Sequence, residues 1–248
     1  MAWWDARNAM RTDALVRLFC FPYAGGSSAI FRDWRTMLAP SIEVVAVELP
    51  GHGIRRDERP FTELDPLVDA LVPALLPDLN RPFAIFGHSL GALIGYELTR
   101  RLYTRVGLQP RRLFVSGHEA PGSMTSPRHV HELPDEEFIA ELHRLNGTPP
   151  EILSDAQLMQ LALPMLRADF QLGETYRYRP YPLLSCPISA YGGLSDQDVS
   201  AESITAWQRT TKGAFTSRMF DGDHFFIHTA TSSLMRQIEL DLTSSQPG

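Results

Sequence analysis

Short apolar runs alternate with helical patterns along most of the chain. The runs are rich in β-branched and aromatic residues, which is typical of buried strands. Six of them are predicted as strands, at residues 15–21, 42–49, 83–87, 113–116, 188–191 and 215–220. Segments with helical spacing of apolar residues are found at 29–38, 65–76, 90–103, 202–210 and 226–242. This alternation predicts a parallel sheet flanked by helices, an α/β fold.

The alternation is interrupted between about residues 121 and 182. This segment has helical patterns and no strand pattern. Pro134 and the acidic residues after it open one helix, and Ser154-Asp155 caps a second. We therefore predict a single domain over residues 1–248 with a helical insertion at about 121–182. An insertion of this kind normally covers a site.

Composition excludes several classes of protein. The chain has 248 residues and a net charge of −6, which argues against a nucleic-acid-binding protein. No apolar run reaches the roughly 20 residues of a membrane span, and the N-terminus lacks a secretory pattern. Cys20 and Cys186 lie in or beside buried strands and are expected to be reduced core thiols. These features predict a cytoplasmic protein without a membrane partner.

The clearest chemical motif is Gly87-His88-Ser89-Leu90-Gly91, which fits G-x-S-x-G between a buried strand and a helix. Such a turn holds the serine in a strained conformation, and glycines two positions on either side let strand and helix approach closely. The helix N-terminus points free N–H groups at the oxygen that becomes negative during attack. The motif predicts the nucleophile elbow of an α/β-hydrolase fold, with Ser89 as nucleophile.

A serine nucleophile needs a base, and His224 is the preferred candidate. In this fold the chain order is serine, acid, histidine. His224 follows the last strand directly, so it is expected at the same sheet edge as Ser89. His228, one helical turn later, is expected on the helix surface. Chain order or a place in the insertion argues against the remaining histidines: His52, His88, His118, His129, His131 and His143.

The orienting acid is expected at the end of the preceding strand. The segment from Ile188 supplies that strand, a glycine turn and then Asp196. Asp198, two residues further, is the alternative. Asp221 and Asp223 flank His224 too closely in its own loop.

Two backbone amides are needed to bind the oxyanion. One is the N–H of Leu90, which follows the nucleophile. The other is expected in the glycine-rich loop after the first strand, where the N–H of Ala24 is preferred. Loss of one such donor costs roughly 3 kcal/mol of transition-state stabilisation.

The sequence resembles a known family, the type II thioesterases, which are the stand-alone editing enzymes of polyketide and non-ribosomal peptide synthesis. The resemblance spans nearly the whole chain in order, and it is carried by these segments: FCFPYAGGSSAIFRDW, VELPGHGIRR, FGHSLGA, LPDEEFIAEL, YGGLSDQDVS and FDGDHFFI. One departure is visible, since His52 stands where an arginine is frequent in this family.

The resemblance implies Ser89, Asp196 and His224 as a catalytic triad, with Ala24 and Leu90 as oxyanion donors. It implies that the insertion is a mobile lid over an acyl chamber and that no metal or organic cofactor is used. The implied substrate is an acyl thioester on the phosphopantetheine arm of an acyl- or peptidyl-carrier protein. Such carriers are typically acidic, so docking would need a local basic patch. The candidate patches are Arg55, Arg56 and Arg59, and Arg177 with Arg179.

Three alternatives remain open from the sequence. A carboxylesterase for small esters would use the same triad. A chain-releasing thioesterase would normally end a megasynthase, whereas this chain starts and stops within one predicted domain. A binding protein of the same fold would normally have lost a triad residue.

Overall fold

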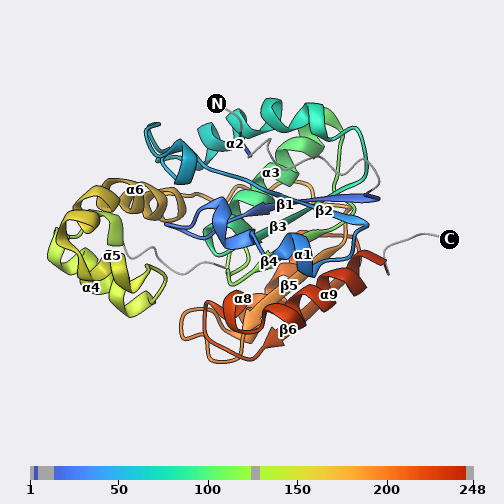
Figure 1. The fold of residues 1–248 in the computed structure, drawn as a ribbon. Coiled ribbons are helices and arrows are strands. Elements are labelled where there is room, and N and C mark those ends of the chain that lie inside the picture. The colour runs from blue at the N-terminus through green and yellow to red at the C-terminus, as the bar shows by residue number, and fades with distance from the viewer. Residues whose placement is uncertain (1–2, 5–13, 124–128, 244–248) are drawn as a thin grey trace.

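A six-stranded parallel sheet forms the centre of the protein (Figure 1). The structure is a computed structural model that describes residues 3–4, 14–123 and 129–243. The strand order is β2-β1-β3-β4-β5-β6. The strands are β1 (Val16–Phe21), β2 (Ile42–Ala46), β3 (Phe83–His88), β4 (Leu113–Ser116), β5 (Ile188–Gly193) and β6 (Phe215–Phe220). Every predicted strand is present, and the predicted α/β class is confirmed.

Helices cover both faces of the sheet, as Figure 1 shows. One face carries α2 (Leu64–Leu75), α3 (Leu90–Val106) and α7 (Ala201–Thr205). The other carries α1 (Trp34–Met37), α8 (Phe226–Thr229) and α9 (Thr231–Thr243). The residues of β1 are buried on both faces, which explains why this strand reads as a continuous apolar run. The helix α3 ends at Gly107, whose φ of +75° favours glycine.

Three predicted helices are divided in the structure. The segment predicted at 202–210 forms α7 and a 3₁₀ helix at Ala206–Thr210. The segment predicted at 29–38 forms a 3₁₀ turn at Ser28–Phe31 and the short α1, because Phe31 and Trp34 both pack against Phe86. The segment predicted at 226–242 breaks between α8 and α9. The hydroxyl of Thr231 donates to the carbonyls of Ile227 and His228 and so competes with the helical backbone bonds there.

The segment between β4 and β5 carries three helices in its described part. They are α4 (Asp135–Leu145), α5 (Pro150–Ser154) and α6 (Ala156–Glu174). The carboxylate of Asp155 accepts from the amides of Gln157 and Leu158, so the predicted cap is confirmed. A small separate core is formed by α4, α6 and the 3₁₀ helix at Val130–Glu132, with α5 packed against it. Its buried residues are Val130, Phe138, Leu142, Met159, Leu163 and Leu166. In Figure 1 the group lies beside the sheet, with α6 nearest to it.

Candidate active site

The turn between β3 and α3 brings Ser89 to the edge of the sheet. Ser89 has φ +52° and ψ −120°, a conformation that non-glycine residues rarely adopt. A Cβ placed on Gly87 would lie 2.0 Å from the carbonyl oxygen of Gly91. A Cβ on Gly91 would lie 2.2 Å from the carbonyl oxygen of Phe21 in β1. Both glycines are therefore required by close backbone approach, as the motif predicted.

The loops after β5 and β6 bring an acid and a histidine together. His224 Nδ1 lies 2.7 Å from Asp196 Oδ2, and the Asp196 side chain is completely buried. The other oxygen, Oδ1, accepts from the amides of Asp198 and Val199 at 2.9 and 3.1 Å. Burial by itself would raise the pKa of Asp196, but the hydrogen bonds and charge of His224 outweigh it and lower that pKa below its usual value. Asp196 is thus held as a carboxylate facing the imidazole.

The rival acid Asp198 has a different partner. Its carboxylate lies 3.2 Å from Nη1 of Arg144 on α4, and a third of its side chain is exposed. The structure therefore places Asp196, and not Asp198, against His224.

A cavity of about 390 Å³ is lined by every predicted site residue except Asp196. Ser89 and His224 line it together with Ala24 and Leu90. Its apolar lining comes from both the main domain and the helices between β4 and β5: Val130, Leu142, Leu145, Phe170, Val199 and Phe225. Charged side chains also line it: Glu119, Glu141, Arg144, Asp169, Glu174 and Asp198. The apolar part of the lining suits an acyl chain.

The two residues predicted to supply the oxyanion donors, Ala24 and Leu90, both line this cavity. Leu90 is the first residue of α3, and the amides in the first turn of a helix have no partner within the helix. Ala24 lies in the loop after β1, beside Gly25 with its φ of +78°. The amide of Gly25 donates to Asp169 of α6 at 2.7 Å, so this loop is attached to the helices between β4 and β5.

Other histidines surround the site. The ring of His88 lies 5.3 Å from that of His224, centroid to centroid, and its Nδ1 is 2.8 Å from Ser116 Oγ. Burial lowers the pKa of His88 well below its usual value, and the charge of His224 acts in the same direction. His88 therefore stays neutral beside the proposed base. His228 is exposed, as predicted, and its Nε2 contacts the hydroxyl of Tyr23 at 3.1 Å.

Sequence reasoning missed a buried contact between His52 and the insertion. His52 Nε2 lies 2.8 Å from Asp169 Oδ2, across 117 positions of sequence. The available signal was the departure at His52 within the family motif, but no residue pattern pointed to Asp169. Arg55, named above as part of a candidate docking patch, is also buried, because it binds Glu58 through two nitrogens and stacks on Trp3.

One cluster of possible metal ligands occurs among the described residues. It consists of His129, His131 and Glu132, partly exposed before α4. His131 is already paired with Glu174 through Nδ1. Within residues 14–123 and 129–243, no helix is long and apolar enough to cross a bilayer.

A parallel sheet, a strained serine between two glycines and an acid–histidine pair at the same edge define a hydrolase of the α/β-hydrolase fold. Comparison with known proteins then identifies the family. The family model described as "Thioesterase domain" matches residues 16–242. The chain therefore belongs to the thioesterase domain family.

Individual relatives agree with this assignment. The chain is 42% identical to the linear gramicidin dehydrogenase LgrE of Brevibacillus parabrevis, over 97% of this chain and 93% of that protein. It is 39% identical to the thioesterase PikA5 of Streptomyces venezuelae, over 91% of this chain and 80% of that one. Among solved structures, the type II thioesterase BorB from the borrelidin cluster has a TM-score of 0.85 and 38% identity, covering 94% of this chain and 96% of BorB. LgrE carries the name of a dehydrogenase, whereas the family model and the other two relatives are thioesterases.

Proposed function

We propose that this enzyme hydrolyses acyl thioesters from the phosphopantetheine arm of acyl- or peptidyl-carrier proteins, as an editor of stalled or misprimed polyketide or peptide synthases. The observation that carries the proposal is the Asp196–His224 pair, 2.7 Å apart, on an apolar cavity that Ser89 also lines. The relatives LgrE, PikA5 and BorB support the biosynthetic setting by their names. Two unpaired, buried cysteines fit a reducing cytoplasm.

The proposed mechanism passes through an acyl-serine. With Nδ1 of His224 bound to Asp196, Nε2 is the nitrogen that takes the proton of Ser89 while the serine oxygen attacks the thioester carbon. The amides of Ala24 and Leu90 bind the oxyanion. Collapse of the tetrahedral intermediate breaks the carbon–sulfur bond, and the pantetheine sulfur leaves with the proton held by His224. A thiol has a pKa of about 8.5, so it is a far better leaving group than an alcohol.

Water completes the cycle. His224 takes a proton from a water molecule that attacks the acyl-serine, and the same oxyanion donors bind the second tetrahedral intermediate. Collapse returns the proton to Ser89 and frees the carboxylic acid. No step of this scheme needs a metal or an organic cofactor.

We propose that the insertion at about 121–182 acts as a lid over the acyl chamber. Its helices have a separate small core, and Val130, Leu142 and Phe170 from this segment line the cavity. The exposed ion pair between Arg144 of α4 and Asp198 joins the lid to the loop that carries Asp196. Buried contacts of Asp169 on α6 with His52 and Gly25 also join the lid to the domain. Because the lid has its own core, it can move as a unit when these contacts break.

A panel of carrier-bound substrates tests this function. We expect hydrolysis of acyl groups from carrier proteins, short and long, native and aberrant, followed as the mass change of the intact carrier. Matched acyl-cysteamine thioesters and oxygen esters distinguish a thioesterase from a carboxylesterase for small esters. Faster turnover of the oxygen esters would favour the carboxylesterase. Cyclised or transferred products in place of free acids would favour a chain-releasing enzyme.

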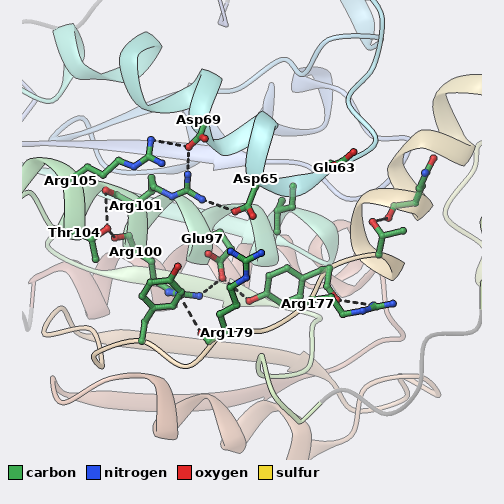
Figure 2. A pocket seen from close by; sticks show the side chains of 15 residues that line it. Glu63, Asp65, Asp69, Glu97, Arg100, Arg101, Thr104, Arg105, Arg177 and Arg179 are labelled. Carbon is green, nitrogen blue, oxygen red and sulfur yellow. Dashed lines mark hydrogen bonds and ion pairs between the residues drawn. The ribbon is translucent and has the colours of Figure 1, made fainter.

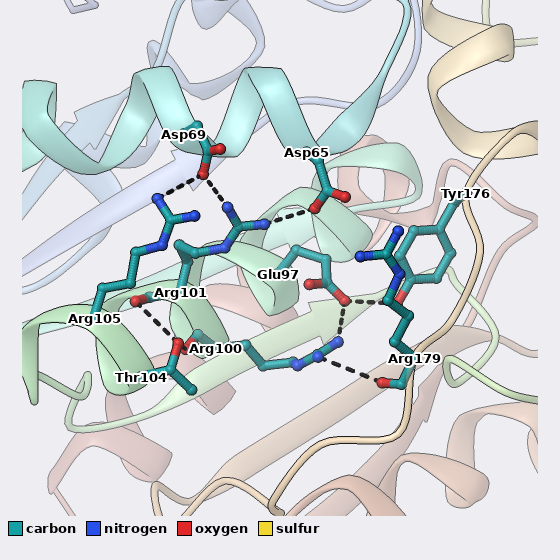
Figure 3. A network of polar contacts seen from close by, with 9 residues as sticks. All are labelled: Asp65, Asp69, Glu97, Arg100, Arg101, Thr104, Arg105, Tyr176 and Arg179. Carbon is teal, nitrogen blue, oxygen red and sulfur yellow. Dashed lines mark hydrogen bonds and ion pairs between the residues drawn. The ribbon is translucent and has the colours of Figure 1, made fainter.

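The carrier is proposed to dock beside the groove between α2, α3 and the end of α6 (Figure 2). Most cations of this groove are already paired: Arg101 with Asp65 and Asp69, Arg105 with Asp69, and Arg100 with Glu97 (Figure 3). Arg177 and Arg179 are exposed on the segment after α6. Arg177 contacts only backbone carbonyls within its own turn among the described residues. These two arginines are suited to an acidic carrier.

Charge reversal tests the docking proposal. In the double variant Arg177→Glu/Arg179→Glu we expect kcat/KM for an acyl-carrier substrate to fall about 10-fold at low salt, because complementary surface charge mainly raises the association rate. The difference should shrink at high salt. The rate on an acyl-cysteamine thioester should stay unchanged.

The control for this experiment is Arg56→Glu. Arg56 is 80% exposed and belongs to the other candidate patch, Arg55, Arg56 and Arg59. Arg55 of that patch is buried and cannot contact a carrier. Equal carrier rates in the wild type and the double variant, with a loss in Arg56→Glu, would move the docking surface to that cluster.

A further inference from the structure

A single carboxylate oxygen connects three parts of the protein beside the active site. Asp169, on α6, is only 2% exposed. Its Oδ2 accepts from the amide of Gly25 at 2.7 Å and from Nε2 of His52 at 2.8 Å. The contact joins the lid helix, the loop that carries the proposed oxyanion donor Ala24, and the loop after β2.

The surroundings of His52 determine its charge. Nδ1 lies 3.1 Å from the carbonyl oxygen of Pro50, and Nε2 faces the carboxylate of Asp169. The Pro50 carbonyl can only accept a hydrogen bond, and so can Asp169 as a carboxylate, so this arrangement favours a proton on both ring nitrogens. His52 is therefore an imidazolium in this arrangement, paired with a buried carboxylate.

The other charges near His52 act in the same direction. Glu48 faces it from the end of the segment after β2, with its carboxylate fixed by the amide and hydroxyl of Ser28 at 3.0 and 2.7 Å. Burial alone would lower the pKa of His52, but Asp169, the Pro50 carbonyl and Glu48 together raise it above its usual value.

The same helix also packs against the loop. A Cβ on Gly25 would lie 2.6 Å from Cδ2 of Leu166, one turn before Asp169 on α6. The Gly25 peptide is thus held by α6 through both a hydrogen bond and a van der Waals contact. The Ala24 N–H belongs to the preceding Tyr23–Ala24 peptide, whose carbonyl accepts from the amide of Gly26 at 2.9 Å. Gly25 lies inside this turn, so a displacement of Gly25 by α6 would shift the turn and the Ala24 N–H with it.

We propose that His52 is a positioning residue for the oxyanion hole. As an imidazolium it holds Asp169 against the amide of Gly25, and α6 in its packed position thereby aligns the N–H of Ala24 with the reacting carbonyl. The inference rests on the proposed function, since it assigns a role within that reaction. Under this proposal, closure of the lid also completes the oxyanion hole, because displacement of α6 would remove Asp169 from the amide of Gly25.

Substitution of His52 tests this proposal. Rates are measured on an acyl-cysteamine thioester and divided by the number of active sites, counted as the endpoint of covalent labelling by a fluorophosphonate. In His52→Gln we expect kcat to fall roughly 10- to 100-fold with KM within about twofold, since loss of a whole oxyanion donor costs about 10²–10³. His52→Arg, which keeps a cation, should recover most of the rate. His143→Gln, an exposed histidine on α4, is the matched control and should be unchanged.

The pH profile distinguishes positioning from a merely structural role. Below the pKa of His52 the imidazolium is present and the hole is aligned; above it the alignment is lost. We therefore expect the wild-type kcat to decline at alkaline pH and that of His52→Arg to hold. A normal kcat in His52→Gln, or the same alkaline decline in wild type and His52→Arg, would overturn the proposal.

A second pair of variants covers the case in which arginine does not fit. Asp169→Asn should lower kcat to a similar extent, and the double variant His52→Gln/Asp169→Asn should be no slower than the worse single one, because both act through the same contact. Losses that multiply would overturn the proposal. A wild-type protein that neither reacts with the fluorophosphonate nor hydrolyses the thioester would instead refute the proposed function. The role of His52 would then fail together with it.

Discussion

Ser89→Ala is expected to abolish hydrolysis of carrier-bound acyl groups, with a fall in kcat on the order of 10⁶-fold, typical of removing the nucleophile from a serine triad. The reason is that no other hydroxyl is predicted to form the acyl intermediate at this site. Alanine keeps the Cβ, and the small size of the change preserves the elbow, whose close contacts are made by Gly87 and Gly91. The measurement is single-turnover release of acid from an acyl-carrier, followed by intact mass.

Covalent labelling supplies the control for this variant. A fluorophosphonate should add one adduct to the wild type, and Ser89→Ala should abolish that adduct. Retained labelling in Ser89→Ala would place the nucleophile elsewhere. A wild-type protein that stays unlabelled would favour a non-catalytic binding protein of this fold.

Asp196→Asn is expected to lower kcat by about 10⁴-fold, the loss found when the orienting acid of a serine triad becomes an amide. The carboxylate of Asp196 accepts from Nδ1 of His224 and stabilises the imidazolium that forms during attack. An asparagine of the same shape can hold the wrong tautomer and carries no charge. The measurement is kcat on an acyl-cysteamine thioester, with circular dichroism to verify the fold.

Asp198→Asn is the matched control, because the same chemical change is made two residues away. Asp198 pairs with Arg144 on the surface of the lid and is partly exposed, so we expect an effect on kcat of no more than a few-fold. A large loss in Asp198→Asn together with a small one in Asp196→Asn would reverse the assignment of the acid.

The elbow shows why some of the site could be predicted from the sequence. The requirement for Gly87 is local, since a Cβ there would meet the carbonyl of Gly91. The requirement for Gly91 comes from Phe21 in β1, but the G-x-S-x-G pattern marks both glycines. A buried strand before the motif and a helix after it are both visible as hydrophobic patterns. The place of His224 after the last strand follows from the rule that parallel strands end at one edge.

The choice between Asp196 and Asp198 shows where the sequence was weaker. Both residues follow the strand that begins at Ile188, and a loop pattern does not fix which side chain turns inward. In the structure the amides of Asp198 and Val199 bind Asp196 Oδ1 and leave Oδ2 for His224. The hydrogen bonds of this turn thus decide that Asp196 faces His224, and the residue types in the loop do not indicate this.

By itself the sequence determined the positions of the strands along the chain, the parallel α/β class and the elbow, because each is marked by a pattern of nearby residues. Only the tertiary structure decided that His52 and Asp169 meet, that Arg55 is buried, and that Arg177 and Arg179 border a groove. The contact between His52 and Asp169 and the place of the two arginines depend on how the helices between β4 and β5 pack against the domain. Arg55 is covered by Glu58 and by Trp3, which is distant in sequence. Side chains far apart in sequence carry no mark of their partners. The contact between His52 and Asp169 gains its stability from burial and charge pairing, and both exist only once α6 has packed beside the sheet.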